Sequence, residues 1–483
     1  MMAMCIALER KLNELADQFR NEPSVLIIQS MSTISAPEPT KTPPLQKETT
    51  VGNYFVSNYP PFSFWKQESI PELKAVLDRA PSTLNSQPST LPLGIYVHIP
   101  FCRKRCHFCY FKVYTDKNSA AIRNYLDALL REFNLYAGKP FVGGRKPNFI
   151  YFGGGTPSYL SVDQLRYLTD GMKALLPWDE AEEVAFEAEP GTLTDQKLKA
   201  IREMGVTRLS LGVENFDDHI LEINGRAHHS KEIARAYAYA REIDFPQINI
   251  DLIAGMVEET EANWLECVRK TIELSPDSVT VYEMEIPFNT TIYKQMQAEG
   301  KLVAPVADWE TKRRWVSYAF SEMEKAGYTV GSAYTAVKDP QRTKFVYRDR
   351  LWAGADLLSL GVASFGHIGG THYQNYHDFE PYLARVEAGE LPIFRALTPT
   401  SEERLIRELV LQLKLGHVSR AYFRDKFGID LTERFAEPMR RLQDWGFLSV
   451  EGDQVRLNRD GLLQVDRLLH EFFLPQHRNA RYA

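Results

Sequence analysis

The chain has 483 residues, of which 44 % are hydrophobic, and it carries a formal net charge of −6 with a pI near 6.1. This length and composition are typical of an ordinary soluble globular protein with one large core and one or two smaller domains. The small negative charge argues against bulk electrostatic attraction to nucleic acid or to anionic lipid, so we expect neither as a partner.

The cysteine and apolar contents narrow the class of protein further. Three of the five cysteines fall within eight residues, which favours a metal site in a reducing compartment over a disulfide framework. No apolar run approaches the roughly eighteen residues that a bilayer-spanning helix needs. Residues 1–30 lack the apolar centre of a signal peptide. We therefore expect no membrane span, a cytoplasmic location and a monomer.

The first 92 residues precede the main folded region. Residues 1–52 are predicted to form a disordered or weakly structured N-terminal extension, and Met31 is an alternative to Met1 as the true start. Residues 53–92 combine an aromatic segment with a linker rich in serine and proline. The aromatic segment is expected to pack onto another part of the chain and to help exclude water from the site.

Between residues 93 and 330, short β-branched or aromatic runs alternate with helical stretches. Ser161 and Gln164 form a capping box at the start of one predicted helix, Ser161–Leu176. Alternating units of this kind imply an α/β fold with a parallel sheet, and six units imply a partial (β/α)6 barrel of the TIM type. Residues 331–400 should complete the barrel and supply substrate loops. The predicted strands are Ile95–Ile99, Phe149–Phe152, Val184–Glu187, Arg208–Val213, Ile248–Ile253 and Val279–Glu283.

The three clustered cysteines follow the first predicted strand, as Cys102, Cys106 and Cys109 in the spacing C-x-x-x-C-x-x-C. Three thiolates on one loop suit three irons of a [4Fe-4S] cluster and leave the fourth iron without a protein ligand. A zinc site with His98 or His107 as the fourth ligand is the alternative.

Other candidate site residues follow the remaining strands and should meet the cysteine loop at the carboxyl edge of the sheet. Gly154, Gly155 and Thr156 come directly after the second strand, where glycine lets a ligand approach the backbone closely. A tight turn is the alternative interpretation of the glycines, and a buried ion pair is the alternative for the carboxylates Glu187 and Asp251. The candidate carboxylates end, follow or lie within the next three strands: Glu187, Glu214 and Asp251.

Residues 401–483 change character and are predicted to form a winged-helix-like helical cap. A hairpin is expected over Phe447–Leu457, around Gly452 and Asp453. Acidic residues are interspersed with the basic ones, so a structural lid is favoured over a DNA reader. The predicted helices are Glu402–Leu415, Arg420–Phe427, Leu431–Trp445 and Gly461–Phe473.

Taken in order, these motifs resemble the radical S-adenosylmethionine (SAM) enzymes, in the branch of oxygen-independent coproporphyrinogen III oxidase. The likeness covers roughly residues 90–470, including the cap, and six ordered motifs are more specific than any one of them. It is carried by the cysteine triad and by residues 96–102, 152–157, 187–190, 208–213 and 249–253.

The resemblance implies that the three cysteines hold a [4Fe-4S] cluster whose open iron chelates the amino and carboxylate groups of SAM. Reductive cleavage of SAM then yields a 5′-deoxyadenosyl radical, with an electron donor such as flavodoxin or ferredoxin. The implied cofactor contacts are packing by Tyr96, the methionine end at Gly154 and Gly155 with Thr156 beside them, the charged groups at Glu187 and Arg226 with Glu214 nearby, and the ribose at Asp251.

Two departures leave the reaction open. Phe111 stands where the oxidase has a further cysteine, and Glu214 stands where it has a glutamine. The signature of the haem-chaperone relatives is not seen at Tyr347–Trp352. The expected function is radical chemistry on a carbon centre of a tetrapyrrole or other conjugated organic substrate. The alternatives are a methyltransferase or cyclopropanase that binds a second SAM, and a haem-binding protein similar to the haem chaperones.

Two further segments are candidates for substrate contact. A basic and aromatic run over residues 338–350 suits an aromatic acid or the propionates of a tetrapyrrole, and a solvated loop is the alternative. His367, His372 and His377 follow a predicted strand at Leu357–Val362 and could reach the pocket, although each could equally be a surface or core histidine.

Overall fold

The computed structural model describes residues 54–80, 91–300, 306–478 and 480. All of them belong to one compact unit, Lys47–Ala483. The predictions for the N-terminal extension, residues 1–52, and for the choice between Met1 and Met31 lie outside the described residues, as does most of the predicted linker, residues 81–90.

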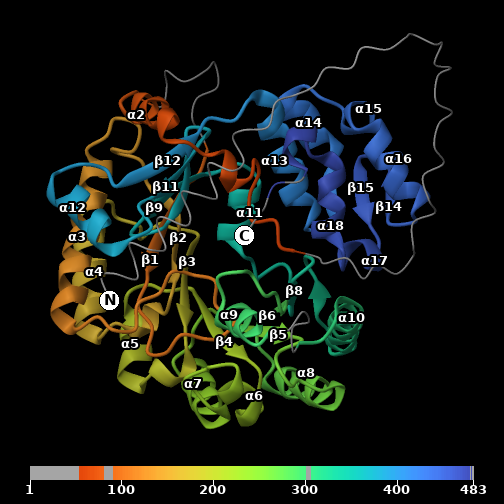
Figure 1. Cartoon of the computed structure of the whole chain (residues 1–483), viewed down its shortest axis with the longest axis horizontal. Helices are drawn as coiled ribbons and strands as arrows, with labels where there is room; N and C mark the ends of the chain where they lie inside the picture. Colours follow the sequence, from red (N-terminus) through yellow and green to blue (C-terminus); the bar gives the residue numbers. More distant parts are fainter. Residues whose placement is uncertain (1–53, 81–90, 301–305, 479, 481–483) are drawn as a thin grey trace, which may run out of the picture. The chain divides into compact units, whose positions relative to one another are not determined.

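A parallel sheet forms the centre of the fold, and all six predicted strands are present in it (Figure 1). Each pairs in parallel with the next one along the chain, as the alternating pattern predicts. A seventh parallel strand, β9 (Asp356–Leu360), pairs with the other side of β1. The six are β1 (Leu93–Ile99), β2 (Pro147–Gly154), β3 (Glu183–Ala188), β4 (Arg208–Glu214), β5 (Gln247–Ala254) and β6 (Ser278–Glu283).

Antiparallel strands extend the sheet at both sides. The meander β10, β11 and β12 follows β9, and β8 and β7 follow β6. Within the described part of the chain the sheet is open, with β12 and β7 as its end strands, which agrees with a partial rather than a closed barrel. The bounds are β7 Thr329–Val330, β8 Thr335–Val337, β10 Phe365–Ile368, β11 Thr371–Asn375 and β12 Ile393–Leu397.

Amphipathic helices cover the outer side of the parallel strands, as Figure 1 shows for α4 to α8. The predicted capping box at α4 is confirmed, since Gln164 N–H donates to Ser161 Oγ at 3.2 Å and Ser161 N–H donates to Gln164 Oε1 at 2.9 Å. None of the helices in the described ranges is both long and apolar enough to cross a bilayer. The helices before the cap are α2 Ile70–Leu77, α3 Ser119–Ala137, α4 Val162–Leu175, α5 Asp195–Glu203, α6 Asp218–Ile223, α7 Ser230–Glu242, α8 Glu261–Leu274, α9 Thr291–Ala298, α10 Trp309–Lys325, α11 Val346–Trp352 and α12 Phe379–Glu387.

The C-terminal cap combines helices with a three-stranded antiparallel sheet (Figure 1). The predicted helix Leu431–Trp445 is split at Phe435, because Pro438 has no N–H to donate and its ring would clash with the Arg434 carbonyl of a continuous helix. The predicted last helix is likewise divided into α17, α18 and a 3₁₀ turn. The elements are α13 Ser401–Leu413, α14 Arg420–Phe427, α15 Leu431–Arg434, α16 Ala436–Asp444, α17 Arg459–Leu462, α18 Val465–Leu469, β13 His417–Ser419, β14 Leu448–Glu451 and β15 Gln454–Leu457.

Residues 54–66, here called the strap, are the described part of the aromatic segment and contact both the barrel and the cap. Phe55 N–H donates to Glu285 Oε1 at 2.7 Å, just after β6. Val56 N–H donates to Asp466 Oδ1 of the cap at 2.8 Å, and Lys414 Nζ donates to the Val56 carbonyl at 2.6 Å. The strap therefore packs onto the rest of the protein, as its aromatic content predicts.

Candidate functional site

A cavity of about 410 Å³ opens at the carboxyl ends of β2 to β6. Its volume lies in the range of about 300–1,000 Å³ that is usual for small-molecule and cofactor sites. All three cysteines of the motif line it, although they come from the loop after β1. Of the eight predicted cofactor residues, seven line the same cavity: Gly154, Gly155, Thr156, Glu187, Glu214, Arg226 and Asp251.

Tyr96 is the predicted cofactor residue that does not line the cavity. Its ring stacks on Tyr151 with 5.9 Å between ring centroids, and its hydroxyl lies 3.1 Å from His98 Nδ1. Tyr151 does line the cavity and donates its hydroxyl hydrogen to Glu187 Oε1 at 2.6 Å. Tyr96 thus supports the cavity wall from behind.

The cysteine loop is fixed at its base and open toward the cavity. Cys102 N–H donates to the Tyr114 carbonyl at 3.1 Å, which joins the two ends of the loop. Thr156 Oγ1 lies 3.3 Å from Cys102 Sγ, and Arg226 Nη1 lies 3.3 Å from Cys106 Sγ. Both donors would stabilise thiolates, and the guanidinium adds a positive charge beside Cys106.

The residues present fit an iron–sulfur cluster. Burial raises the pKa of Cys102 to about 11 and of Cys109 to about 12, while Thr156 and Arg226 oppose the shift at Cys102 and so favour its thiolate. A Cβ on Gly155 would lie 3.0 Å from Cys102 Sγ, so the glycine keeps space free next to that sulfur. Thiols that bind three different irons need not gather at one point.

The alternative of a single zinc ion finds less support in the arrangement. In the described part of the chain, no three Cys, His, Asp or Glu side chains gather closely enough to hold one metal ion. The two predicted histidine ligands do not line the cavity with the thiols. His98 contacts Tyr96, and His107 Nδ1 lies 2.9 Å from the Ile223 carbonyl.

Glu187 is the penultimate residue of β3 and contacts the glycine loop. Besides the Tyr151 hydroxyl, its carboxylate accepts the Gly154 N–H at 3.2 Å. The backbone φ of Gly154 is +112°, a conformation that L side chains rarely adopt. Burial raises the pKa of Glu187 to about 7, against an ordinary value of 4.5. A cationic ligand group would restore its ordinary ionisation, since neutral donors are its partners here.

Asp251 and Glu214 extend the acidic wall of the cavity. Asp251 accepts from Ser210 Oγ and from Asn249 Nδ2, both at 2.8 Å, and burial raises its pKa. Glu214 has a positive φ of 63° and lies 3.6 Å from Arg226 Nη2. Burial raises the pKa of Glu214 to about 7 although the guanidinium opposes the shift.

Arg226 supplies positive charge to the wall. Its Nη2 donates to the Gly212 carbonyl at 2.5 Å, and its Nη1 contacts Cys106. Its Nε is buried without a hydrogen-bond partner, an arrangement that is uncommon for a buried donor. This N–H therefore has no partner among the described residues.

Several cavity residues were missed by the sequence reasoning. Arg208, Ser210 and Gly212 are every second residue of β4, and Asn249 and Asp251 are every second residue of β5; all of them line the cavity. Alternate residues of a strand share one face, so the predicted strands carried the signal for these positions. Phe345 was not missed, because it belongs to the predicted substrate segment 338–350; it precedes α11, and its ring centroid lies 4.5 Å from the Arg208 guanidinium.

The predicted substrate segments contribute little to the cavity. Within the basic run 338–350, Phe345 lines the cavity, whereas Arg350 pairs with Glu182 on the surface at 2.8 Å. His367 and His372 are buried beside each other, with 3.0 Å between their Nδ1 atoms, and neither lines the cavity. The third histidine, His377, pairs with Asp378.

Comparison with known proteins gives consistent matches. The model of the radical SAM superfamily matches residues 96–271, and that of the HemN C-terminal domain matches residues 400–463. The chain is 31 % identical over 379 residues to the haem chaperone HemW of Bacillus subtilis (strain 168), covering 78 % of this chain and 98 % of that protein. It is 27 % identical over 426 residues to the oxygen-independent coproporphyrinogen III oxidase of Pseudomonas aeruginosa, covering 84 % of this chain and 91 % of that protein.

Among solved structures, the chain resembles that of coproporphyrinogen III oxidase (HemN) from Escherichia coli, a radical SAM enzyme. The TM-score is 0.75, and the match covers 87 % of this chain and 96 % of that one. With 23 % sequence identity, this likeness concerns the fold.

Proposed function

The chain belongs to the radical SAM superfamily, in the branch that contains the oxygen-independent coproporphyrinogen III oxidases and HemW, and from this premise we propose that it is an enzyme that cleaves SAM at the cavity to start chemistry on an organic substrate. The superfamily implies SAM and a [4Fe-4S] cluster as cofactors. One observation carries the proposal. The three thiols and seven of the eight candidate cofactor residues line a single cavity.

In this proposal Cys102, Cys106 and Cys109 hold the cluster, which with SAM supplies a 5′-deoxyadenosyl radical. Glu187 pairs with the ammonium of SAM, because a carboxylate with neutral partners gains most from a cation. Arg226 offers its unpartnered Nε–H to the SAM carboxylate.

The remaining cofactor contacts are proposed as follows. Asp251, held by Ser210 and Asn249, accepts hydrogen bonds from the ribose hydroxyls. The glycine loop lets the methionine end approach the backbone, with Thr156 beside Cys102. Glu214 lies beside the Arg226 guanidinium, next to the proposed place of the SAM carboxylate.

The substrate is proposed to occupy the rest of the cavity, where aromatic side chains gather. Phe55 of the strap, Phe111 of the cysteine loop and Phe345 line this part together with Tyr282. Planar aromatic walls suit a tetrapyrrole or another conjugated molecule, and they also exclude water from a reactive radical. The strap and the loop that bears Phe111 are proposed to close over the bound substrate. A small electron-transfer protein such as flavodoxin or ferredoxin is proposed to reduce the cluster.

The test is anaerobic reconstitution with iron and sulfide, followed by incubation with SAM, a reductant and candidate porphyrinogens. We expect 5′-deoxyadenosine to form, and mass spectrometry to show a product that has lost carboxyl groups as carbon dioxide. A product that gains a methyl group, with two SAM bound for each chain, would point to the methyltransferase alternative. Deoxyadenosine that never forms, in protein that carries a full cluster, would refute the proposal.

A haem-binding protein is the second candidate, and the 31 % identity to a haem chaperone favours it. This candidate predicts tight, stoichiometric haem binding without SAM cleavage. Haem titration followed by absorbance, performed on the reconstituted protein, separates the two. The enzyme proposal predicts deoxyadenosine release and weak or substoichiometric haem binding.

A further inference from the structure

Glu189 lies two residues beyond Glu187 and was given no role by the sequence motifs. It precedes the 3₁₀ turn Pro190–Thr192, and its Oε1 accepts the Gly191 N–H at 3.1 Å. Its side chain is 11 % exposed and lines the cavity. At this position the carboxylate can accept hydrogen bonds from the cysteine loop and from residues 227–228.

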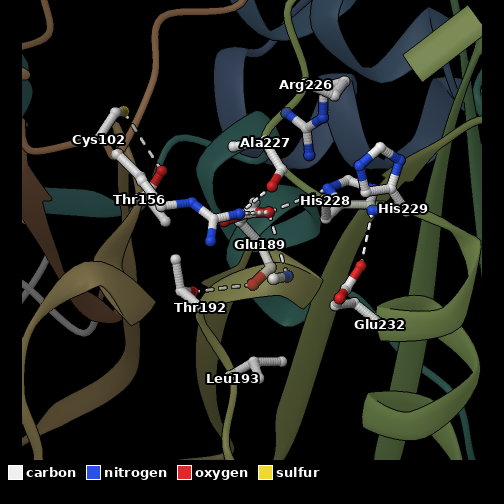
Figure 2. A network of polar contacts seen from close by, with 12 residues as sticks. Cys102, Thr156, Glu189, Thr192, Leu193, Arg226, Ala227, His228, His229 and Glu232 are labelled. Carbon is white, nitrogen blue, oxygen red and sulfur yellow. Dashed lines mark hydrogen bonds and ion pairs between the residues drawn. The ribbon is translucent and has the colours of Figure 1, made fainter. Parts of the chain in front are cut away.

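Two loops that are far apart in the sequence meet at the Glu189 carboxylate (Figure 2). His228 Nδ1 lies 3.0 Å from Oε1, and the other ring nitrogen of His228 lies 3.2 Å from the Val213 carbonyl. Arg103 Nη2 lies 3.6 Å from the same Oε1 and also donates to the Ala227 carbonyl. The carboxylate thus joins β3, the end of β4, the cysteine loop and residues 227–228.

The turn is closely packed around this junction. A Cβ on Gly191 would lie 2.5 Å from Arg103 Nη2 and 2.8 Å from Glu189 Oε1, so glycine is needed for the two charged groups to meet. Ser158 Oγ accepts the Glu189 N–H at 3.0 Å, and Thr192 Oγ1 donates to the Glu189 carbonyl at 2.8 Å. The backbone on both sides of the carboxylate is therefore fixed.

The partners of Glu189, Arg103 and His228, lie close in the chain to a candidate cluster ligand or to a residue that touches one. Arg103 follows Cys102 directly, and Ala227 and His228 follow Arg226, whose Nη1 contacts Cys106 Sγ at 3.3 Å. We propose that Glu189 is a positioning residue that clamps the cysteine loop and Arg226 to the cavity wall, and so sets both the geometry and the charge around the cluster. This inference rests on the proposed function for the identity of the cluster.

The clamp makes a charge prediction that a merely structural role does not make. A negative charge near a cluster disfavours its reduction, and a positive charge favours it. Glu189→Gln keeps the shape of the side chain and removes a negative charge, so the reduction potential should rise. Arg103→Met removes a positive charge from the same pair, so the potential should fall. Glu189→Asp keeps the charge, so the potential should stay near that of the wild type.

The experiment has one readout that needs no cluster. In the apo-protein, alkylation of Cys102 by N-ethylmaleimide, followed by mass spectrometry, should be several-fold faster in Glu189→Gln and Arg103→Met than in the wild type. Cys267, which is buried in α8, serves as the internal reference. Glu203→Gln, which breaks an exposed pair with Arg166, serves as the matched control and should leave the rate unchanged.

The second readout is a redox titration of reconstituted protein followed by electron paramagnetic resonance. Potentials that move in opposite directions, together with faster alkylation of Cys102, support the clamp. Unchanged alkylation in both variants overturns it, as do potentials that stay fixed or move in the same direction. If Glu189→Gln does not fold, the alkylation rate of Cys102 and the reduction potential are measured in Arg103→Met and Glu189→Asp instead. The clamp then predicts faster alkylation and a lower potential in Arg103→Met and a potential near that of the wild type in Glu189→Asp. A wild-type protein that binds no cluster refutes the proposed function, while alkylation still tests the clamp.

Discussion

Two buried charges at the junction of the strap and the cap, Lys414 and Asp466, are paired with each other, whereas two cavity carboxylates, Glu187 and Asp251, accept hydrogen bonds from neutral groups. Lys414 Nζ lies 2.8 Å from Asp466 Oδ1, with the two side chains 0 % and 1 % exposed. Asp466 also accepts the Val56 N–H and the Tyr334 hydroxyl hydrogen. Every group of this junction has a partner within the chain.

Glu187 and Asp251 differ from Asp466 in this respect, although Glu214 and Glu189 in the same cavity do have charged partners. Glu187 and Asp251 accept hydrogen bonds from hydroxyl, amide and backbone donors, and their pKa values are raised by burial. Charges that the fold leaves without a counter-charge are typical of functional sites, because a ligand completes them. The comparison indicates that the junction serves stability and that the cavity serves binding.

The largest expected effect, on activity and on iron content, comes from a cysteine of the loop and not from Cys267, a buried cysteine outside the cavity. Cys106→Ser should abolish deoxyadenosine formation and lower the iron content, because a serine hydroxyl is a poor ligand for the cluster. Cys267→Ala should keep both, since Cys267 is buried in α8 away from the cavity. Iron and sulfide analysis with chromatography of deoxyadenosine checks this. Full activity in Cys106→Ser would contradict the assignment of the loop.

A substitution at the junction of the strap and the cap should lower the free energy of unfolding and leave the affinity for SAM unchanged. Lys414→Met leaves the Asp466 carboxylate buried without its counter-charge, which should cost about 3–5 kcal/mol of the free energy of unfolding. The affinity for SAM should be retained, because Lys414 does not line the cavity. Urea denaturation measures the first quantity, and calorimetric titration of the folded variant measures the second. If the unfolding midpoint of Lys414→Met equals that of the wild type, the junction does not stabilise the fold, and the proposed difference between the two regions is contradicted.

A substitution in the cavity should lower the affinity for SAM and leave the free energy of unfolding nearly unchanged. Glu187→Gln removes a charged hydrogen bond to the ligand, worth about 1.5–3 kcal/mol, so the affinity for SAM should fall by about 10- to 100-fold. Stability should be unchanged or slightly higher, because burial of the carboxylate is itself unfavourable. The control is Glu180→Gln, which breaks an exposed pair with Lys146. A stability loss as large as that of Lys414→Met, with SAM affinity intact, would reverse the comparison.

A smaller effect is expected from pH. With its pKa raised to about 7, Glu187 keeps its proton in the folded protein at pH values where the unfolded chain has lost it. Stability should therefore decrease as pH rises from about 4.5 to 7, since the folded state binds more protons there. SAM affinity should increase across the same upper range, because the ammonium needs the ionised carboxylate. Titrations between pH 6 and 8 test this, and Glu187→Gln should flatten the dependence.

The central strands were predictable because each is a short run of β-branched or aromatic residues followed by a helical pattern. The same order placed Glu187, Glu214 and Asp251 at one edge of the sheet, since parallel strands end there together. The pairing of β9 with β1 was not predictable, because it joins segments about 260 residues apart. The single helix predicted over Leu431–Trp445 was wrong, because Pro438 cannot lie in the interior of a continuous helix.

Glu189 was missed at the site because long-range contacts define its place there. Glu189 looks like any polar turn residue until Arg103 and His228 are brought to it. Tyr96 shows the converse, because its motif indicates cofactor contact while Tyr151 stands between it and the cavity. A motif indicates that a residue belongs to the site, and the packing of the folded chain decides whether that residue lines the cavity or supports a residue that does.

Electron paramagnetic resonance of the reduced, reconstituted protein, recorded before and after SAM is added, is the most direct test of a cluster with an open iron at this cavity. We expect a [4Fe-4S] signal that changes when SAM is bound and is lost from Cys106→Ser, with 5′-deoxyadenosine released on turnover. A signal that SAM leaves unaltered, with no deoxyadenosine formed, would contradict it.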